Sequence, residues 1–258
     1  MIRISVILPE VRLRSWVRAG FKRPILGIQI MGEHRKLLHY GLQRSGTNFL
    51  ESLLKRKYRV RFLNSDKDRS SPLQKHFRLY DEKDIVPEPQ YYNQLQLPDF
   101  ASFERLLKVV PNFYIVVSKD PYSWLLSYDN WAKKCNWPAV SHHYILEYNL
   151  FYGKWLEFSQ QSDKIIFIRY FDLLQDTDEV LNCLASKVGL KKRVLSPFMS
   201  SAISQVPKST RFSNARLNFY LKEKYLKSYK KHDLQEVNYL LDPTVVSLLG
   251  YEKKTIAG

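Results

Sequence analysis

Apolar and polar positions alternate in blocks along the chain, and from about residue 37 these blocks follow a strand-and-helix order. Short apolar runs of strand type occur at "KLLHYG", "RVRFL", "FYIVVSK" and "KIIFIRY". After the first run, "NFLESLLKRKY" brings Phe49, Leu50, Leu53 and Leu54 onto one face of a helix. Strands that alternate with helices are typical of βαβ units around a parallel sheet. We therefore expect an α/β fold of three layers with a central parallel sheet.

Further helices are predicted between and after these strands. "DFASFERLLKVV" has Asp99 as a helix N-cap, and "DPYSWLLSYDNWAKK" carries Pro121 in its first turn. "SHHYILEYNLFYGKWLEFSQQ" is predicted as a long aromatic helix, and "DLLQDTDEVLNCLASKVGL" as one helix that ends at Gly189. The run "FYIVVSK" is apolar at consecutive positions, which indicates a central strand buried on both faces.

The domain organisation follows from where this pattern starts. Residues 1–36 show no clear periodicity and are read as a basic N-terminal extension. Residues 37–258 are read as a single α/β domain with a helical C-terminal part. Within it, the stretch 64–98 is polar, rich in Pro and Asp, and too long for an ordinary connection. Such loops are usually functional or mobile.

Charge and composition limit the classes of molecule that the chain is expected to bind. The formal net charge of +16 predicts attraction to polyanions such as nucleic acid, an anionic membrane, an anionic polysaccharide or a phosphorylated nucleotide. No run reaches the roughly 20 apolar residues of a transmembrane segment, and the N-terminus is broken too early for a signal peptide. Cys135 and Cys183 belong to no metal-binding pattern, and whether they pair stays open. We expect a soluble cytoplasmic protein without a metal.

The stretch "HYGLQRSGTNFL" carries the most informative motif. Gly41 and Gly46 stand at the ends of a loop between a strand and a helix, as in a phosphate-binding loop. That signature requires Lys and then Ser or Thr after the second Gly, whereas Thr47 and Asn48 follow here and the cation, Arg44, lies inside the loop. The loop keeps the backbone that binds an oxyanion and lacks the parts that handle Mg²⁺. We expect an anion that reacts without a bound metal.

A second chemically distinctive segment follows the central strand. Ser118–Asp120 lies at the end of that strand, as Gln43–Asn48 does at the end of the first. Ligands of parallel sheets bind beyond the carboxyl ends of the strands. The two segments are therefore predicted to meet.

At these residues the sequence resembles the family of sulfotransferases that use 3′-phosphoadenosine 5′-phosphosulfate (PAPS). "QRSGTNFL" resembles the family's 5′-phosphosulfate loop, and "VVSKDPYSWLLSY" resembles its 3′-phosphate segment. "IIFIRYFDLLQDTDEVLNCLASKVGL" is similar to a strand and helix that family members share. The resemblance covers roughly residues 37–190 in the correct order. It implies the P-loop-like sulfotransferase fold and PAPS as sulfuryl donor.

The resemblance also implies the residues that hold the donor. They are Arg44, Ser45, Gly46, Thr47 and Asn48 on the phosphosulfate, Phe49 near the adenine, and Lys119 with Ser127 on the 3′-phosphate. Two departures affect the 3′-phosphate site. Common members have Arg where Lys119 stands, and the glycine-rich basic loop of the cytosolic branch is absent, so "PKSTR" with Lys208 and Arg211 is taken as its substitute.

Transfer of the sulfuryl group to a hydroxyl requires a base and a charge stabiliser. Arg44 is the predicted stabiliser and His76 the predicted base. The family often has a Lys/His pair after the loop helix, which corresponds to Lys75 and His76 here. The competing bases are Glu51, Asp81 and Glu88.

The acceptor is a hydroxyl compound that the sequence does not identify, with a glycan as one candidate. Two other functions compete with sulfuryl transfer. A P-loop kinase-like phosphotransferase is disfavoured because the Lys and Mg²⁺ equipment is missing. A basic nucleic-acid-binding protein fits the charge, but no helix-turn-helix, zinc-finger or RNP pattern supports it, so no nucleic acid is expected.

The aromatic residues of the two long helices, such as Trp124, Trp131 and Trp155, are read mainly as core packing.

Overall fold

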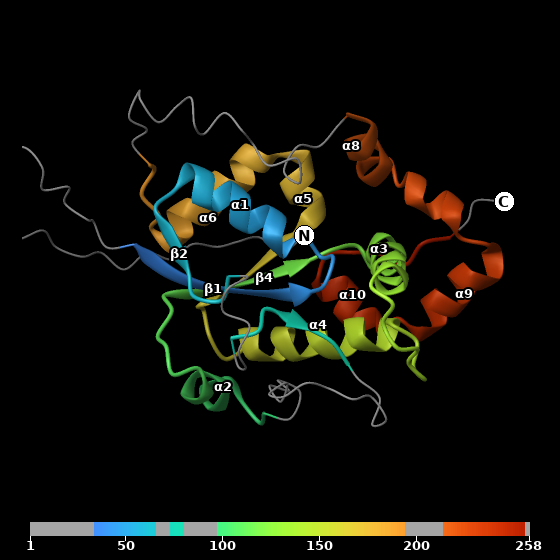
Figure 1. Cartoon of the computed structure of the whole chain (residues 1–258), viewed down its shortest axis with the longest axis horizontal. Helices are drawn as coiled ribbons and strands as arrows, with labels where there is room; N and C mark the ends of the chain where they lie inside the picture. Colours follow the sequence, from blue (N-terminus) through green and yellow to red (C-terminus); the bar gives the residue numbers. More distant parts are fainter. Residues whose placement is uncertain (1–33, 66–72, 80–96, 194–213, 256–258) are drawn as a thin grey trace, which may run out of the picture. The chain divides into compact units, whose positions relative to one another are not determined.

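The predicted strands form one parallel sheet in the computed structural model, which describes residues 34–65, 73–79, 97–193 and 214–255 (Figure 1). The strand order is β2-β1-β4-β5, and the short β3 also pairs with β1. All the pairings are parallel. The strands are β1 Arg35–Leu42, β2 Val60–Phe62, β3 His76–Phe77, β4 Phe113–Ser118 and β5 Ile165–Arg169. The expected α/β class with a central parallel sheet is confirmed.

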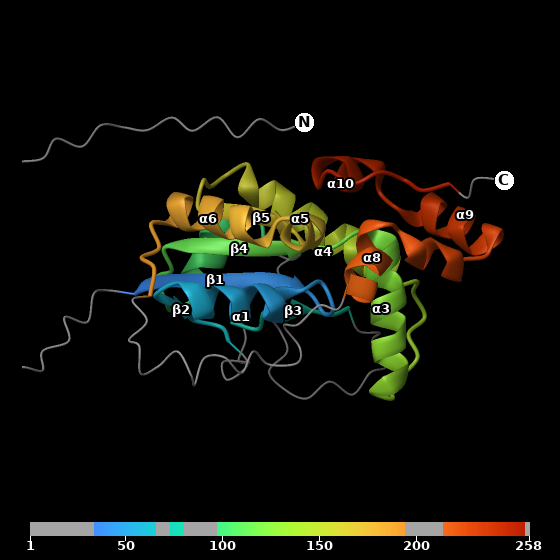
Figure 2. The ribbon, with the colours of Figure 1, turned by 90° about the horizontal axis from the view of Figure 1, so that it is seen from above.

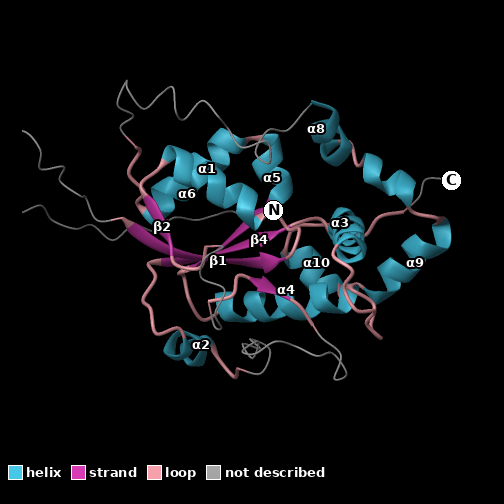
Figure 3. Cartoon of the chain, viewed as in Figure 1, coloured by secondary structure: helices cyan, strands magenta, loops and turns pink. Residues whose placement is uncertain are grey.

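Helices surround this sheet, as the colouring by secondary structure shows (Figure 3). Their bounds in chain order are α1 Thr47–Lys57, α2 Phe100–Leu106, α3 Pro121–Lys134, α4 Ile145–Ser159, α5 Tyr170–Gln175, α6 Thr177–Val188, α8 Asn214–Leu221, the 3₁₀ helix η4 Lys224–Ser228, α9 Lys231–Leu240 and α10 Pro243–Leu248. Helices α1, α5 and α6 lie on one face of the sheet, with α2 and α4 on the other (Figure 1). The turned view places α3, α8, α9 and α10 beyond the carboxyl ends of β1 and β4 (Figure 2).

The two faces of the sheet have separate cores because neighbouring side chains of a strand point to opposite sides. From β1, Leu38 and Tyr40 join the core under α4, whereas Leu37 joins the core under α1 and α6. In β4, Val116 and Val117 divide in the same way. Both strands are therefore buried on both sides, which explains why they read as uninterrupted apolar runs.

Aromatic rings fill the core under α4, as the sequence predicted. Trp155 is fully buried, with its ring 4.8 Å from Tyr40 and 5.5 Å from Phe103 between centroids. Tyr148 and Tyr152 are also fully buried, and their hydroxyls donate to backbone oxygens at the end of β4. Helix α4 thus supports the strand end that carries the second motif.

Helix ends agree with the sequence at three positions and differ at a fourth. Asp99 accepts from Ser102 N at the start of α2, and Pro121 occupies the first turn of α3 behind the cap Asp120. The single helix predicted from "DLLQDTDEVLNCLASKVGL" is wrong. Asp176 leaves helical geometry (φ −142°, ψ 83°) and its carboxylate accepts from Glu179 N, so it ends α5 and caps α6. Gly189 closes α6 at φ 72°, as predicted.

The polar stretch 64–98 contains a strand that the pattern did not reveal. β3 extends the edge of β1 beyond β2, pairing Gly41 with His76 and Leu42 with Phe77. Between β2 and β3, the Asn64 side chain takes the place of a strand residue, since its amide bonds both His39 N (3.0 Å) and His39 O (2.8 Å). This side chain pairs the His39 backbone groups, so β1 keeps its edge hydrogen bonds across the gap.

The predicted N-terminal extension, 1–36, lies outside the described residues up to 33. Its last residues do not belong to an extension, because β1 begins at Arg35 and pairs Arg35 and Lys36 with β2. Among the described residues, we find no helix whose length and apolar character would suffice for a bilayer span.

Candidate functional site

A cavity of about 820 Å³ opens beyond the carboxyl ends of β1 and β4. That volume falls within the range of small-molecule sites, roughly 300–1,000 Å³. The residues that line it and matter below are Arg44, Gly46, Thr47, Asn48, Phe49, Glu51, Lys75, His76, Lys119, Ser127, Trp131, Trp137, Arg216 and Tyr220. The cavity thus joins the two strand ends that the sequence marked.

The loop after β1 has an unusual backbone. Arg44 and Gly46 both have positive φ, 71° and 107°. At Gly46 a Cβ would stand 2.5 Å from Tyr170 Cδ2, so both conformation and space require glycine. Gly46 is also the residue before α1 and has no side chain to cap that helix. The first turn of α1 therefore faces the cavity with its positive dipole end.

Close packing fixes the same loop from behind. A Cβ on Gly41 would collide with the Ser45 hydroxyl and lie 3.0 Å from Val117 O. Ser45 is fully buried, and its backbone N donates to Leu42 O at 3.1 Å. It is not among the residues that line the cavity. Unlike its loop neighbours, Ser45 therefore serves the turn itself, and its hydroxyl does not reach the cavity.

The cation of the loop is exposed. Arg44 places its guanidinium carbon 4.9 Å from the ring centroid of Trp131, a residue of α3. Stacking of this kind stabilises a guanidinium by about 0.5–1 kcal/mol at an exposed site. Trp131 therefore acts on the site, although its helical spacing with Trp124 and Tyr128 suggested core packing. Trp124 and Tyr128 are fully buried and do belong to the core.

The end of β4 brings Lys119 and Ser127 into direct contact. Lys119 Nζ donates to Ser127 Oγ at 2.8 Å, across the turn between the strand and α3. The ammonium also lies 4.6 Å from the ring centroid of Tyr220 and 5.5 Å from that of Tyr170. The eight-residue spacing recognised in the sequence therefore corresponds to a pair of side chains that face one cavity.

The surroundings of Lys119 disfavour its protonated, positively charged form. Burial, followed by the positive charges of Arg44 and Arg216, lowers the pKa of Lys119 to about 7, although Asp120 acts in the other direction. Lys119 is only 3% exposed. A buried ammonium near two exposed guanidinium groups is stabilised when an anion joins it. The electrostatics of this end of the cavity therefore favour an anionic ligand.

The two motif segments meet, as predicted from their places at the strand ends. Trp124 Nε1, on α3 after β4, donates to Gln43 O in the loop after β1 at 2.9 Å. Arg44 also lies close enough to Lys119 to affect its pKa. The carboxyl ends of β1 and β4 thus form one site at the point where the strand order changes direction.

His76 reaches the same site from the start of β3. Its Nε2 lies 2.7 Å from Thr47 Oγ1, the hydroxyl at the first position of α1. The preceding residue, Lys75, donates from Nζ to Asn48 Oδ1 at 2.5 Å. The Lys/His pair therefore contacts consecutive residues of the glycine loop, which explains why a short strand in a polar stretch belongs to the site.

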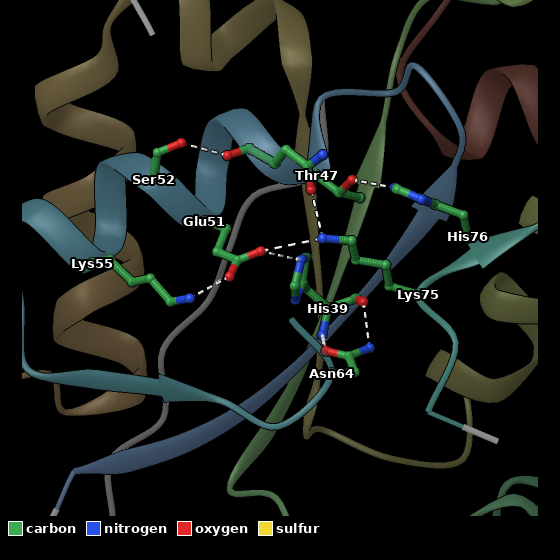
Figure 4. Close-up of polar contacts among 9 residues, drawn as sticks. His39, Thr47, Glu51, Ser52, Lys55, Asn64, Lys75 and His76 are labelled. Carbon is green, nitrogen blue, oxygen red and sulfur yellow. Dashed lines mark hydrogen bonds and ion pairs between the residues drawn. The ribbon is translucent and has the colours of Figure 1, made fainter. Parts of the chain in front are cut away.

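Glu51 lies at the centre of a polar network behind these contacts (Figure 4). Its carboxylate is 2.5 Å from Lys55 Nζ, 3.3 Å from Lys75 Nζ and 3.1 Å from His39 Nε2. Burial alone would raise the pKa of Glu51, but these partners outweigh it and hold that pKa well below its ordinary value. Burial lowers the pKa of the fully buried His39. Glu51 is thus ionised and engaged, which disfavours it as a base.

The remaining predicted residues divide by whether the structure describes them. Phe49 lines the cavity and packs edge-on against Tyr170, with ring centroids 6.0 Å apart. Lys208, Arg211, Asp81 and Glu88 lie outside the described residues. Cys135 and Cys183 are both free. No group of three or more His, Cys, Asp or Glu side chains suited to a metal ion occurs in the described ranges.

Several cavity residues carry no local sequence signal. Arg216 and Tyr220 come from α8, and Trp137 follows α3. Arg216 is one of many basic residues in a basic chain, and Trp137 has no periodic partner that would mark it. The sequence led to one related expectation, which was a further basic residue from the C-terminal part near the 3′-phosphate.

No family model and no curated protein matches the sequence. Among solved structures, the chain is similar to mouse sulfotransferase SULT7A1 complexed with PAP, with a TM-score of 0.40 and 13% identity, over 81% of this chain and 82% of that one. A likeness at this level carries no argument about function. The conclusion that stands on the geometry is an α/β protein whose β1 and β4 ends form one cation-lined cavity.

Proposed function

We propose that the chain is a sulfotransferase that moves a sulfuryl group from PAPS to an acceptor hydroxyl. The observation that carries the proposal is one cavity in which the loop after β1, the Lys119–Ser127 pair and the Thr47–His76 pair meet. PAPS carries anionic groups at two separated points and reacts at one of them. It therefore needs two anion sites and a base beside one of them, which matches these three parts.

The β1 end suits the 5′-phosphosulfate. The first turn of α1 offers backbone N–H groups and the positive end of the helix dipole, and Arg44 adds a guanidinium. Thr47 and Asn48 supply polar side chains at the same helix start. We assign Phe49, beside Tyr170, to the adenine side on the resemblance noted in the sequence.

The β4 end suits the 3′-phosphate. Lys119 and Ser127 provide an ammonium and a hydroxyl already in contact. A phosphate beside them would offset the burial and the positive neighbours that together lower the pKa of Lys119. Arg216 supplies a further cation from the C-terminal helices. We propose that Arg216 contributes what the sequence led us to seek at Lys208 and Arg211.

The chemistry needs one proton transfer and one sulfuryl transfer. His76 accepts the proton of the acceptor hydroxyl while the acceptor oxygen forms a bond to sulfur and the bond from sulfur to the bridging phosphate oxygen breaks. The products are a sulfate ester and adenosine 3′,5′-bisphosphate. Arg44 stabilises the charge that develops on the bridging and sulfuryl oxygens. Thr47 holds the His76 ring at the loop through their 2.7 Å contact.

The acceptor class we propose is a carbohydrate hydroxyl. Trp131 and Trp137 both line the cavity. Because Arg44 lies over the Trp131 ring and Arg78 over the Trp137 ring, we propose that the opposite indole faces stack on the apolar faces of sugar rings.

Calorimetry on the full chain in EDTA tests the donor assignment. Adenosine 3′,5′-bisphosphate should bind without metal and about 10- to 150-fold more tightly than ATP, since ATP lacks the 3′-phosphate and one charged hydrogen-bonding site is worth about 1.5–3 kcal/mol. Adding Mg²⁺ should leave its affinity unchanged. ATP affinity that equals it or requires Mg²⁺ would support the phosphotransferase instead. Transfer of ³⁵S from labelled PAPS onto a panel of acceptors, with neutral glycans, acidic glycans and phenols side by side, then tests the acceptor class.

A further inference from the structure

A buried ion pair connects the site to the helix that carries the glycine loop. Lys75 is 7% exposed, and its ammonium is 3.3 Å from the Glu51 carboxylate. A buried ammonium without a counter-charge is costly. Glu51, on α1, supplies that counter-charge and holds the Lys75 side chain in place.

The helix geometry sets what Lys75 can reach. Asn48 and Glu51 are three residues apart on α1, a spacing that brings two side chains onto the same helix face. Lys75 contacts both, with its Nζ 2.5 Å from Asn48 Oδ1. One ammonium thus ties the chain before β3 to the first turn of α1, at the turn where the proposed donor site begins.

The backbone carries this connection to His76. Lys75 O accepts from Gly41 N at 3.0 Å, which fixes the residue at the end of β1. With both its backbone and its side chain held, Lys75 leaves the next residue, His76, little freedom, and His76 meets Thr47. The contacts of Glu51 with His39 and Lys55 hold its carboxylate in turn (Figure 4).

We propose that Glu51 is a positioning residue, which holds the Lys75 ammonium against Asn48 and thereby fixes His76 at Thr47 beside the reacting group. The inference rests on the proposed function for its catalytic part. The structural part, that Glu51 holds Lys75, stands independently of any substrate. Glu51 acts through its neighbours and does not itself exchange a proton.

The kinetic test compares Glu51→Gln with the wild type. Glutamine keeps the shape of the side chain and removes the charge that holds Lys75. We expect kcat at saturating PAPS to fall about 10- to 100-fold, the effect of a displacement of about 1 Å at a reacting group. The dissociation constant of adenosine 3′,5′-bisphosphate should change less than threefold. Glu51→Asp, which retains the charge on a shorter side chain, should recover part of the lost kcat.

Glu157→Gln serves as the matched control, because Glu157 also pairs with a lysine, Lys154, but on the far part of α4 and outside the cavity. It should leave kcat within twofold. An equal loss in both variants, or a parallel loss of kcat and bisphosphate affinity in Glu51→Gln, would overturn the positioning role. Glu51→Asp provides the same comparison if Glu51→Gln does not fold by circular dichroism.

Lysine ammonium ¹H–¹⁵N spectra test the structural part without substrate. A buried, hydrogen-bonded ammonium exchanges slowly and gives a visible signal, which Lys75→Arg identifies by removing it. We expect that signal to disappear in Glu51→Gln and to persist in Glu157→Gln. Its persistence in Glu51→Gln would overturn the inference. If the wild type shows the signal and Glu51→Gln loses it, but the wild type transfers no sulfuryl group, the proposed function fails while the contact with Lys75 stands.

Discussion

The carboxyl ends of β1 and β4 each present a cation to the same cavity, but the two cations have opposite surroundings. Arg44 is exposed and stacked on Trp131, and a guanidinium stays charged at any physiological pH. Lys119 is 3% exposed, and its pKa is lowered to about 7. The β1 end therefore offers a permanent charge, whereas the charge at the β4 end depends on pH and on the ligand.

This difference suggests that the two ends have different roles, one in turnover and one in binding. The β1 end also holds Thr47 and His76, so its permanent charge lies beside the proposed base. The β4 end holds Lys119 and Ser127 in direct contact and suits recognition of an anion. Substitutions at the two ends should therefore separate turnover from binding selectivity.

The largest expected effect is at the β1 end. His76→Ala should lower kcat by about 10²–10⁴, the range for loss of a general base, while the affinity for adenosine 3′,5′-bisphosphate stays nearly intact. Steady-state kinetics with labelled PAPS and calorimetry measure the two quantities. His232→Ala is the control, because His232 is exposed on α9 and pairs with Asp233 outside the cavity. A fall below tenfold in His76→Ala would exclude His76 as the base.

An intermediate effect is expected at the β4 end. Lys119→Met keeps most of the side-chain volume and should remove about 1.5–3 kcal/mol of the preference for the 3′-phosphorylated nucleotide over its analogue without that phosphate. Competition binding with both nucleotides measures the preference. Lys133→Met, at an exposed lysine of α3, should leave it unchanged. If Lys119→Met keeps the preference, residues other than Lys119 bind the 3′-phosphate.

The smallest expected effect is a pH dependence of nucleotide affinity, which we expect to arise only at the β4 end. Because the pKa of Lys119 is about 7 in the free protein and a phosphate raises it, binding of the bisphosphate above pH 7 takes up a proton. Affinity should then fall as pH rises from 7 to 9, by at most about tenfold per pH unit. Calorimetry in buffers of different ionisation enthalpy measures the uptake.

The same titration compares the two ends directly. The analogue without the 3′-phosphate should bind with little proton uptake, since it places no phosphate beside Lys119. Lys119→Arg should also abolish the uptake. Equal uptake by both nucleotides would mean that the protonation occurs away from Lys119.

Local sequence predicted much of this molecule correctly because local physics decides it. Runs of apolar residues predicted the strands, and Asp99 and Pro121 marked helix starts, since each acts on its own backbone within one turn. Gly41 and Gly46 marked the loop after β1, in which Gly46 has a positive φ. The helix predicted across Asp176 was wrong, because a side-chain cap there competes with the helical pattern of its neighbours.

The site could be predicted only in part. The loop and the Lys119–Ser127 pair are short segments whose spacing is visible in the sequence, although their roles remain proposals. β3 was missed because a two-residue strand has no periodicity, and it exists only because the end of β1 offers an unpaired edge. Arg216 was missed because nothing near it in the chain differs from an ordinary surface helix.

The sequence by itself determined the alternation of strands and helices, the glycine loop after β1 and the polar segment after β4, since these depend on conformational preferences within a few residues. Only the tertiary structure decided that Arg44, Lys119 and Arg216 share one cavity and that Glu51 is buried beside Lys75. Charges interact through space and burial, and both depend on which distant segments the sheet brings together.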